Sequence, residues 1–248
     1  MKLLRNIKDY ILSYKYSRDD FFLVSFPKTG RSWLTYMLHN LDDYFLKMRS
    51  THDLSEIIIE NGFRQDPNLM FSNKNRFKFR RSKVIFLVRD PRDVVVSHFH
   101  QVTKRSKNPF IFESISEFVR DDILGFKRII YFYNLWYNNK KIPSKFLLIK
   151  YEDLVNNGVS EIVKICEFVG LDIDIKKVQE VFKMSTADKM REMEKNNSLD
   201  GFRYFGNDIN HLKVRKAKVG NYTNELNSSD IEFCNHILKD LVNYYNYS

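Results

Sequence analysis

Glycine, proline and cysteine are all scarce in this sequence of 248 residues, which contains 8, 5 and 2 of them. So few glycines and prolines, with no stretch of low complexity, exclude a fibrous or disordered protein. The two cysteines, Cys166 and Cys234, are too few for a disulfide framework or a cysteine-rich metal site. We expect both to be buried free thiols in a reducing compartment.

Long apolar runs are missing as well. No run approaches the roughly 18 residues that a membrane-spanning helix needs. Charged residues interrupt the first ten positions before a signal-peptide core can form. We therefore expect a cytoplasmic protein with no membrane span.

The sequence is rich in apolar and basic residues. Hydrophobic residues make up 43% of the chain and aromatic residues 15%, which is ample material for a buried core. Lys and Arg number 41 against 31 Asp and Glu, giving a net charge of +10. This excess suits an anionic partner such as a nucleic acid, an acidic lipid, a polysaccharide or a phosphorylated cofactor. A general bias toward lysine is the alternative explanation, so the charge names no partner.

Three short apolar runs have the character of buried parallel strands, because they lack the alternation of a half-exposed strand. They span residues 21–26, 84–88 and 146–149. Helical spacing of apolar residues follows the first two runs, and it also predicts one long helix over 114–139 and further helices over 159–169 and 175–183. Repeated strand-turn-helix units indicate an α/β fold with a central parallel sheet, in one domain spanning 1–248.

Two further features concern the second half of the chain and the loops. Ser229, with Glu232 three residues later, forms a capping-box signal that predicts the start of a last helix. Residues 60–81 and 196–228 have no clear periodicity, and we expect them to be mainly loop.

The turn after the first strand has the chemistry of a phosphate site. It reads Phe26-Pro27-Lys28-Thr29-Gly30-Arg31-Ser32-Trp33. Free N–H groups and the positive end of the following helix point beyond the strand. Gly30 allows close backbone approach, Lys28 supplies a cation and Ser32 a hydroxyl. The Lys precedes the Gly, so this is not a Walker A motif; an ordinary turn with a surface lysine is the alternative.

The second strand runs into a similar junction. Arg89 stands at the strand end and Ser97 lies eight residues further on, in the next helix, so the two side chains can converge on one phosphate. Pro91 is placed to open that helix, where its missing N–H costs nothing. Taken alone, the charges of residues 89–93 are equally explained by ion pairs on the surface.

Together, these two loops resemble those of the cytosolic-type sulfotransferases, which use 3′-phosphoadenosine 5′-phosphosulfate (PAPS). The first is similar to their 5′-phosphosulfate loop and departs from it at Arg31, where the family usually has Thr. The second is similar to their 3′-phosphate motif. The resemblance implies the P-loop nucleotide-kinase-like sulfotransferase fold, in a bacterial or otherwise divergent member of the family.

Three further segments extend the resemblance. Tyr151 follows the third strand, where the family's Tyr contacts the adenosine. Ser185 opens a segment similar to the one beside the purine, with Ala187 in place of the usual Phe. The run Arg215-Lys216-Ala217 is similar to the mobile loop that closes on the 3′-phosphate, with Ala217 in place of Gly.

The resemblance also implies roles for individual residues. PAPS would be the donor and 3′-phosphoadenosine 5′-phosphate (PAP) the product, with no metal needed. Lys28 would neutralise charge on the leaving 5′-phosphate, and Trp33 would border the adenine. The implied catalytic residues are Lys28, His52 and Ser97. The implied cofactor-binding residues are Lys28, Thr29, Gly30, Arg31, Ser32, Trp33, Arg89, Ser97, Tyr151, Ser185, Arg215, Lys216 and Ala217.

A histidine with a near-neutral pKa suits removal of the acceptor's proton. His52 follows the first helix, where the family places Lys-Thr-His with its catalytic base, although Ser50 replaces the Lys here. His98 and His100 flank the second phosphate loop. We favour His52 as the base, with His100 as the alternative.

No recognisable motif identifies the acceptor. We expect the acceptor group to be a hydroxyl or an amine of a small molecule or carbohydrate, and we expect no nucleic acid polymer as a partner. Segments near residues 54–81, 104–112 and 196–212 are expected to line its pocket. The alternatives are a P-loop-type kinase and a non-catalytic protein that binds nucleotide or polyanion. No sequence feature indicates an oligomeric state.

Overall fold

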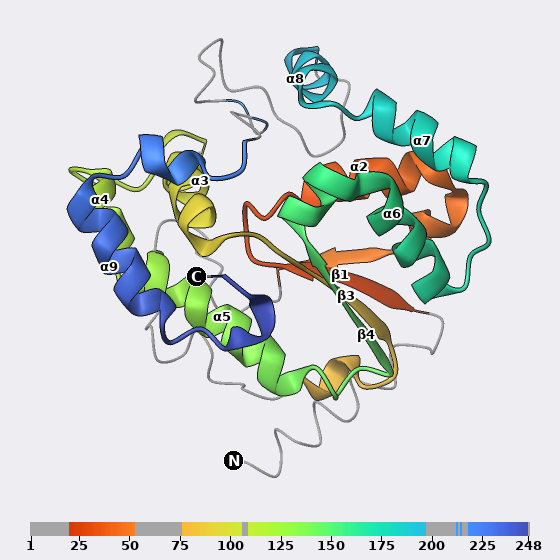
Figure 1. Ribbon diagram of the computed structural model, residues 1–248, viewed down its shortest axis with the longest axis horizontal. Helices are drawn as coiled ribbons and strands as arrows, with labels where there is room; N and C mark the ends of the chain where they lie inside the picture. Colours follow the sequence, from red (N-terminus) through yellow and green to blue (C-terminus); the bar gives the residue numbers. More distant parts are fainter. Residues whose placement is uncertain are drawn as a thin grey trace.

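The computed structural model describes residues 20–52, 76–105, 109–196, 212, 214 and 218–247. Within them the chain forms one parallel sheet with the strand order β2-β1-β3-β4 (Figure 1). The three predicted apolar runs are strands, with boundaries shifted by one residue. The strands are β1 (Phe21–Ser25), β2 (Arg49–Thr51), β3 (Lys83–Val88) and β4 (Lys145–Lys150).

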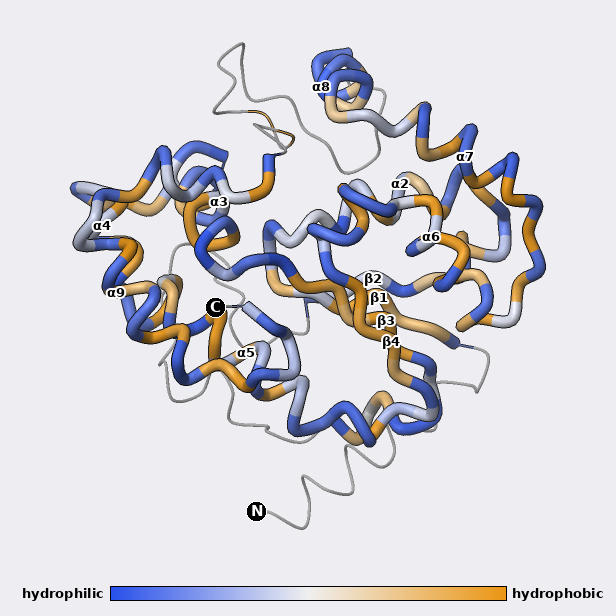
Figure 2. Tube along the Cα trace, viewed as in Figure 1, coloured by the Kyte–Doolittle hydropathy of each residue, from blue (hydrophilic) through white to orange (hydrophobic). Residues whose placement is uncertain are grey.

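Both faces of the sheet are covered by helices, which confirms the predicted α/β class. Along β1, Phe22 and Val24 pack into one hydrophobic cluster while Phe21 and Leu23 pack into the other. Figure 2 shows hydrophobic residues along the central strands. One face carries α3 (Pro91–Lys104), α4 (Ile115–Arg120), α5 (Phe126–Asn139) and α9 (Ser228–Leu238). The other carries α2 (Arg31–Leu41), α6 (Tyr151–Val169) and α7 (Ile175–Met184), and α8 (Ala187–Lys195) follows α7.

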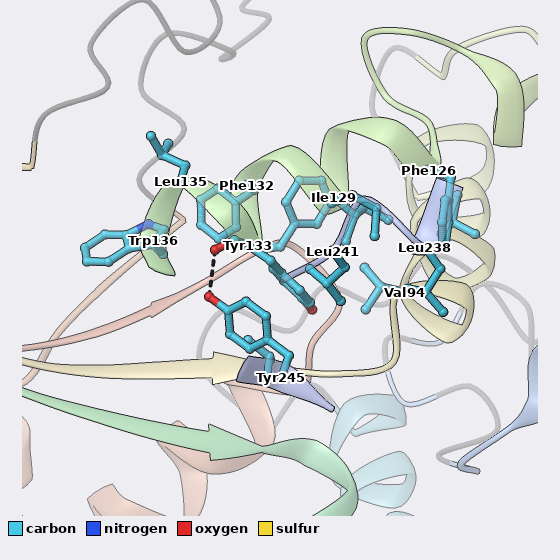
Figure 3. Packing of buried hydrophobic residues seen from close by; sticks show 14 of the residues in the cluster. Val94, Phe126, Ile129, Phe132, Tyr133, Leu135, Trp136, Leu238, Leu241 and Tyr245 are labelled. Atoms are coloured by element: carbon cyan, nitrogen blue, oxygen red, sulfur yellow. Dashed lines mark hydrogen bonds between the residues drawn. The ribbon is translucent and has the colours of Figure 1, made fainter. Parts of the chain in front are cut away.

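The cluster on the α5 face is dominated by aromatic rings (Figure 3). The ring of Trp136 stacks on Phe86 of β3 with centroids 5.4 Å apart. Near the end of the chain, the hydroxyl of Tyr245 donates a 2.6 Å hydrogen bond to the carbonyl oxygen of Tyr133 on α5. Short 3-10 helices lie at Asp43–Lys47, Phe77–Phe79, Asn221–Asn224 and Asn243–Tyr245.

The single long helix predicted over 114–139 is wrong, because α4 ends at Arg120 and α5 begins at Phe126. Asp121 adopts an extended conformation, and its carboxylate accepts hydrogen bonds from the N–H groups of Ile123 (3.0 Å) and Leu124 (2.7 Å). A side chain that bonds nearby backbone in this way competes with the helix.

The predicted cap of the last helix is also wrong. Helix α9 begins at Ser228, and its cap is Asn227, whose side chain accepts from the N–H of Asp230 at 2.9 Å. Asn and Ser are about equally good caps, and here Asn227 takes the role. The hydroxyl of Ser229 instead accepts from the Arg120 guanidinium at 3.3 Å.

Several boundaries were missed. The helix predicted over 159–169 begins at Tyr151, directly after β4, with non-helical dihedral angles at Asn157. Strand β2 and helix α8 were not predicted. The predicted loops over 60–81 and 196–228 lie largely outside the described residues, and their described parts include two of the 3-10 helices. None of the described helices is long and apolar enough to cross a membrane.

Candidate functional site

The first predicted phosphate loop joins β1 to α2. Gly30 caps α2 in the left-handed conformation, with φ at 96°, and its carbonyl accepts from the N–H groups of Trp33 and Leu34. The N–H groups of Arg31 and Ser32 precede those donors, and no side chain in the described part of the chain caps the helix. They are therefore available at the positive end of the helix for an anion beyond the strand.

Gly30 is required at this turn for two reasons. Its positive φ favours glycine, and a Cβ atom there would lie 2.6 Å from the ring of Tyr151. Lys28 also has a positive φ, of 72°. A non-glycine residue in this region stores about 1–2 kcal/mol of strain, and such strain gathers at functional sites.

The side chains of Lys28 and Thr29 in this loop make different contacts. The ammonium of Lys28 donates to the Oε1 atom of Gln101 on α3 at 3.2 Å, so the cation lies between the first loop and α3. Thr29 is fully buried, and its hydroxyl donates to the carbonyl oxygen of Phe26 at 3.0 Å. The side chain of Thr29 therefore stabilises the turn itself.

The second predicted loop joins β3 to α3. Asp90 caps α3 by accepting from the N–H of Arg92 at 2.9 Å, and Pro91 opens the helix as predicted. The main chain of Arg89 is fixed by the hydroxyl of Tyr133, which accepts from the Arg89 N–H (3.0 Å) and donates to its carbonyl oxygen (2.8 Å).

The guanidinium of Arg89 lies among three groups from different elements. Its Nη2 donates to the carboxylate of Asp93 at 3.2 Å and to the carbonyl oxygen of Lys218 at 3.0 Å. Its centre lies 4.5 Å from the ring centroid of Tyr151. The ion pairs of this loop, Arg89–Asp93 and Arg92–Asp90, do form, but they are largely buried rather than on the surface. The Nε atom of Arg89 is buried with no hydrogen-bond partner among the described residues.

The carboxylate of Glu152 connects this loop to Tyr247. Glu152 accepts from the N–H of Asp90 and from the hydroxyl of Tyr247, each at 2.8 Å. Burial raises the pKa of Glu152, and these two hydrogen bonds oppose that rise. Asp93 in turn connects α3 to the segment near residue 220, because its carboxylate accepts from the N–H groups of Gly220 (2.8 Å) and Tyr222 (3.0 Å).

His52 follows the edge strand β2, and its Nδ1 lies 2.9 Å from the carbonyl oxygen of Ser25. A carbonyl oxygen only accepts, so Nδ1 carries the hydrogen and the neutral ring presents its basic nitrogen, Nε2. His100 is buried, with Nε2 at 3.2 Å from a carboxylate oxygen of Glu225. Burial is the main cause that lowers the pKa of His98 to about 4.

Aromatic residues form one side of the site. The indole N–H of Trp33 donates to the carbonyl oxygen of Ser185 at 2.7 Å, and its ring meets Tyr151 edge-on at 5.7 Å. Ser185 is fully buried, and its hydroxyl donates to the carbonyl oxygen of Phe182. Phe182 itself lies only 6.2 Å from Trp33 between ring centroids.

These segments enclose a cavity of about 530 Å³, within the range of pockets that hold nucleotide-sized ligands. Thr29 and Ser185 are outside its lining, and His100 is too. Arg215, Lys216 and Ala217 lie outside the described residues. The predicted site residues in the lining are Lys28, Gly30, Arg31, Ser32, Trp33, His52, Arg89, Ser97 and Tyr151.

Sequence reasoning missed several residues of the lining. Phe182 supplies an aromatic ring to the cavity lining that also includes Ala187, the position at which the expected Phe is absent. The apolar face of α7 was predicted, but its contact with Trp33 depends on how α7 packs on α2 and α6. The other missed residues are Asp93, Val96, Gln101, Val155, Met190, Val214, Lys218 and Asn221. No group of His, Cys, Asp and Glu among the described residues could hold a metal ion.

A family model and relatives in sequence point to one family, and a solved structure shares the fold. A model of the sulfotransferase domain matches residues 18–245. Sulfotransferase 2A6 of Rattus norvegicus is 27% identical over 81% of this chain and 81% of its own, and amine sulfotransferase of Oryctolagus cuniculus is 23% identical over 97% and 85%. The crystal structure of mouse sulfotransferase SULT7A1 complexed with PAP has a TM-score of 0.63 at 20% identity, covering 91% of this chain and 85% of that one.

Proposed function

The chain belongs to the sulfotransferase family, whose donor is PAPS, and we propose that it transfers the sulfuryl group of PAPS to a hydroxyl or amine of a small-molecule or carbohydrate acceptor. The observation that carries this proposal is that residues of both predicted phosphate loops and His52 line one cavity. It brings a cradle for the donor and a candidate base into one space.

The described residues fit the donor. The Nε atom of Arg89 is a buried donor without a hydrogen-bond partner among the described residues, as expected of a group that binds an anion. Gly30 lets the ring of Tyr151 pack against the loop, since a Cβ there would lie 2.6 Å from that ring. Arg89 and Ser97 would hold the 3′-phosphate, and the N–H groups of Arg31 and Ser32 would hold the 5′-phosphosulfate. Trp33, Tyr151 and Phe182 would border the adenine.

Two residues would act on the transfer itself. When bound, PAPS supplies an activated sulfuryl group. His52 would take the acceptor's proton on Nε2, because its Nδ1–H is bonded to the carbonyl of Ser25. Lys28 would stabilise the charge that collects on the leaving 5′-phosphate. An interaction that strengthens only in the transition state raises the rate rather than the affinity.

Relatives suggest acceptors to try first. Two are named amine sulfotransferase and flavonol 3-sulfotransferase (Flaveria bidentis), the second 25% identical over 89% of this chain and 80% of its own. We propose screening amines, flavonols, steroids and oligosaccharides with PAPS labelled in its sulfate. Transfer of label to an acceptor supports the proposal. If no acceptor of any class becomes labelled while PAP binds tightly, the protein is better explained as a non-catalytic nucleotide-binding protein.

Calorimetry separates the donor assignment from the kinase alternative. We expect PAP to bind and ATP to bind far more weakly, because Arg89 and Ser97 suit a 3′-phosphate that ATP lacks. Preference for ATP would contradict the proposal. We also propose one domain and a cytoplasmic location, which two buried free thiols, Cys166 and Cys234, support.

A further inference from the structure

Arg31 stands out among the cationic residues of the cavity. It is the first residue of α2, next to Gly30, and it belongs to the cavity lining. Its Nη1 atom is buried with no hydrogen-bond partner among the described residues. Lys28 and Arg89 differ, because the first donates to Gln101 and the second to Asp93.

A guanidinium in this position is costly to the folded protein. Burial lowers the pKa of Arg31 to about 10, which reflects the loss of hydration. A buried charge without a partner is strongly unfavourable, and unsatisfied buried polar groups in a native structure commonly belong to functional sites. The arrangement becomes favourable when an anion enters the cavity.

The neighbours of Arg31 indicate which anion this is. Arg31 and Ser32 present the first-turn N–H groups of α2, and Lys28 lies three residues earlier in the same turn. The N-terminus of α2, its free N–H groups and the Lys28 ammonium all favour an anion at the place where the 5′ group of the donor would lie. No acidic residue occupies the first turn of α2. No carboxylate of that turn therefore competes with an anionic ligand for these donors.

We propose that the side chain of Arg31 binds the 5′-phosphosulfate of the donor and shares with Lys28 the charge that develops during transfer. The inference rests on the proposed function and adds a second cation to it. The acceptor oxygen forms a bond to sulfur while the bond from sulfur to the bridging 5′ oxygen breaks. The electron pair stays on the 5′-phosphate, beside Lys28 and Arg31, and the acceptor's proton goes to His52.

A comparison of two ligands tests this role without turnover. PAP carries a 5′-phosphate and adenosine 3′-monophosphate does not, so calorimetry of both isolates the 5′ group. We expect Arg31→Gln to weaken PAP binding roughly 10- to 100-fold, as for a charge-assisted hydrogen bond, and to leave the monophosphate unchanged. Arg31→Lys should retain part of the affinity. Arg128→Gln, on α5 and outside the cavity lining, is the matched control and should change neither.

Other outcomes overturn the inference in distinguishable ways. Equal weakening of both ligands would mean that Arg31 acts through general charge or structure, and no change in either would remove it from the donor site. A loss of kcat/KM confined to anionic acceptors would assign it to the acceptor instead. If the unaltered protein binds neither ligand, the proposed function itself fails.

Stability gives an independent readout. Because Arg31→Gln removes a charge whose Nη1 atom is buried without a hydrogen-bond partner among the described residues, we expect the variant without nucleotide to melt at the same or a higher temperature. PAP should then raise the melting temperature of the variant less than that of the unaltered protein. A variant that melts lower without nucleotide would show that the guanidinium stabilises the fold, which contradicts the proposal.

Discussion

The hydroxyl of Tyr133 holds the main chain of Arg89 from both sides, accepting from its N–H at 3.0 Å and donating to its carbonyl oxygen at 2.8 Å. One side chain on α5 thus fixes the residue at which β3 ends. Tyr133 is fully buried, and burial raises its pKa far above the usual range, so the hydroxyl keeps its proton.

Tyr133→Phe should therefore damage both stability and donor binding. It leaves a partly buried N–H and C=O without their partner, which costs about 1–3 kcal/mol, and it frees the Arg89 backbone. We expect urea unfolding to show this loss and calorimetry to show weaker PAP binding. Tyr131→Phe on the same helix is the control. Unchanged PAP affinity would mean that other contacts are enough to place Arg89.

Lys28→Met should reduce turnover more than affinity. It keeps most of the aliphatic stem but removes the charge near the leaving group, so kcat should fall by about 10- to 100-fold. PAP affinity should fall less, because the backbone donors of α2 remain. Lys47→Met, at an exposed position, is the control. Equal losses in kcat and affinity would limit Lys28 to binding.

His52→Gln should remove the proposed base and lower kcat by about 10²- to 10⁴-fold, with PAP affinity kept. The measurement is kcat with PAPS in excess, beside calorimetry of PAP binding. His100→Gln is the matched comparison and should leave kcat nearly unchanged, because His100 is outside the cavity lining. The reverse pattern would make His100 the base.

His98 should make stability depend on pH. Its native pKa of about 4 lies below the usual value of about 6.5. Between these values the unfolded chain takes up a proton that the native state excludes, so stability falls as pH falls. We expect the unaltered protein to lose about 3 kcal/mol more than His98→Gln over this interval. Parallel curves from urea unfolding would contradict this.

Gly158→Ala should disturb the aromatic side of the cavity. A Cβ at this position in α6 would lie 1.9 Å from the ring of Phe182, so the ring must move. Overpacking of this kind costs about 1–3 kcal/mol, more than the gain in helix propensity. Thermal unfolding and PAP affinity should both decline, while Ser160→Ala, exposed on the same helix, should be nearly neutral. A stabilised variant would show that Phe182 has room to shift.

The sequence predicted what depends on local pattern. The apolar runs of β1, β3 and β4 predicted a buried sheet. The residues of the loops after β1 and β3 predicted a phosphate site, and residues of both loops line one cavity. Strand β2 escaped because Arg49–Thr51 is short, polar and largely exposed, so only its pairing with β1 makes it a strand. Phe182 escaped because its neighbours are distant in sequence. The break at Asp121 was readable as a helix-competing side chain, but the apolar spacing on both sides obscured it.

The two phosphate loops leave neighbouring strands, because β1 and β3 pair directly in the centre of the sheet. Backbone hydrogen bonds hold such strands about 4.8 Å apart, and neither strand can shift without disrupting the core. If the two loops bind the two phosphates of the donor as proposed, the pairing of β1 with β3 sets the distance between the two phosphate sites. Changes in segments outside the sheet would then alter the choice of acceptor without altering that distance.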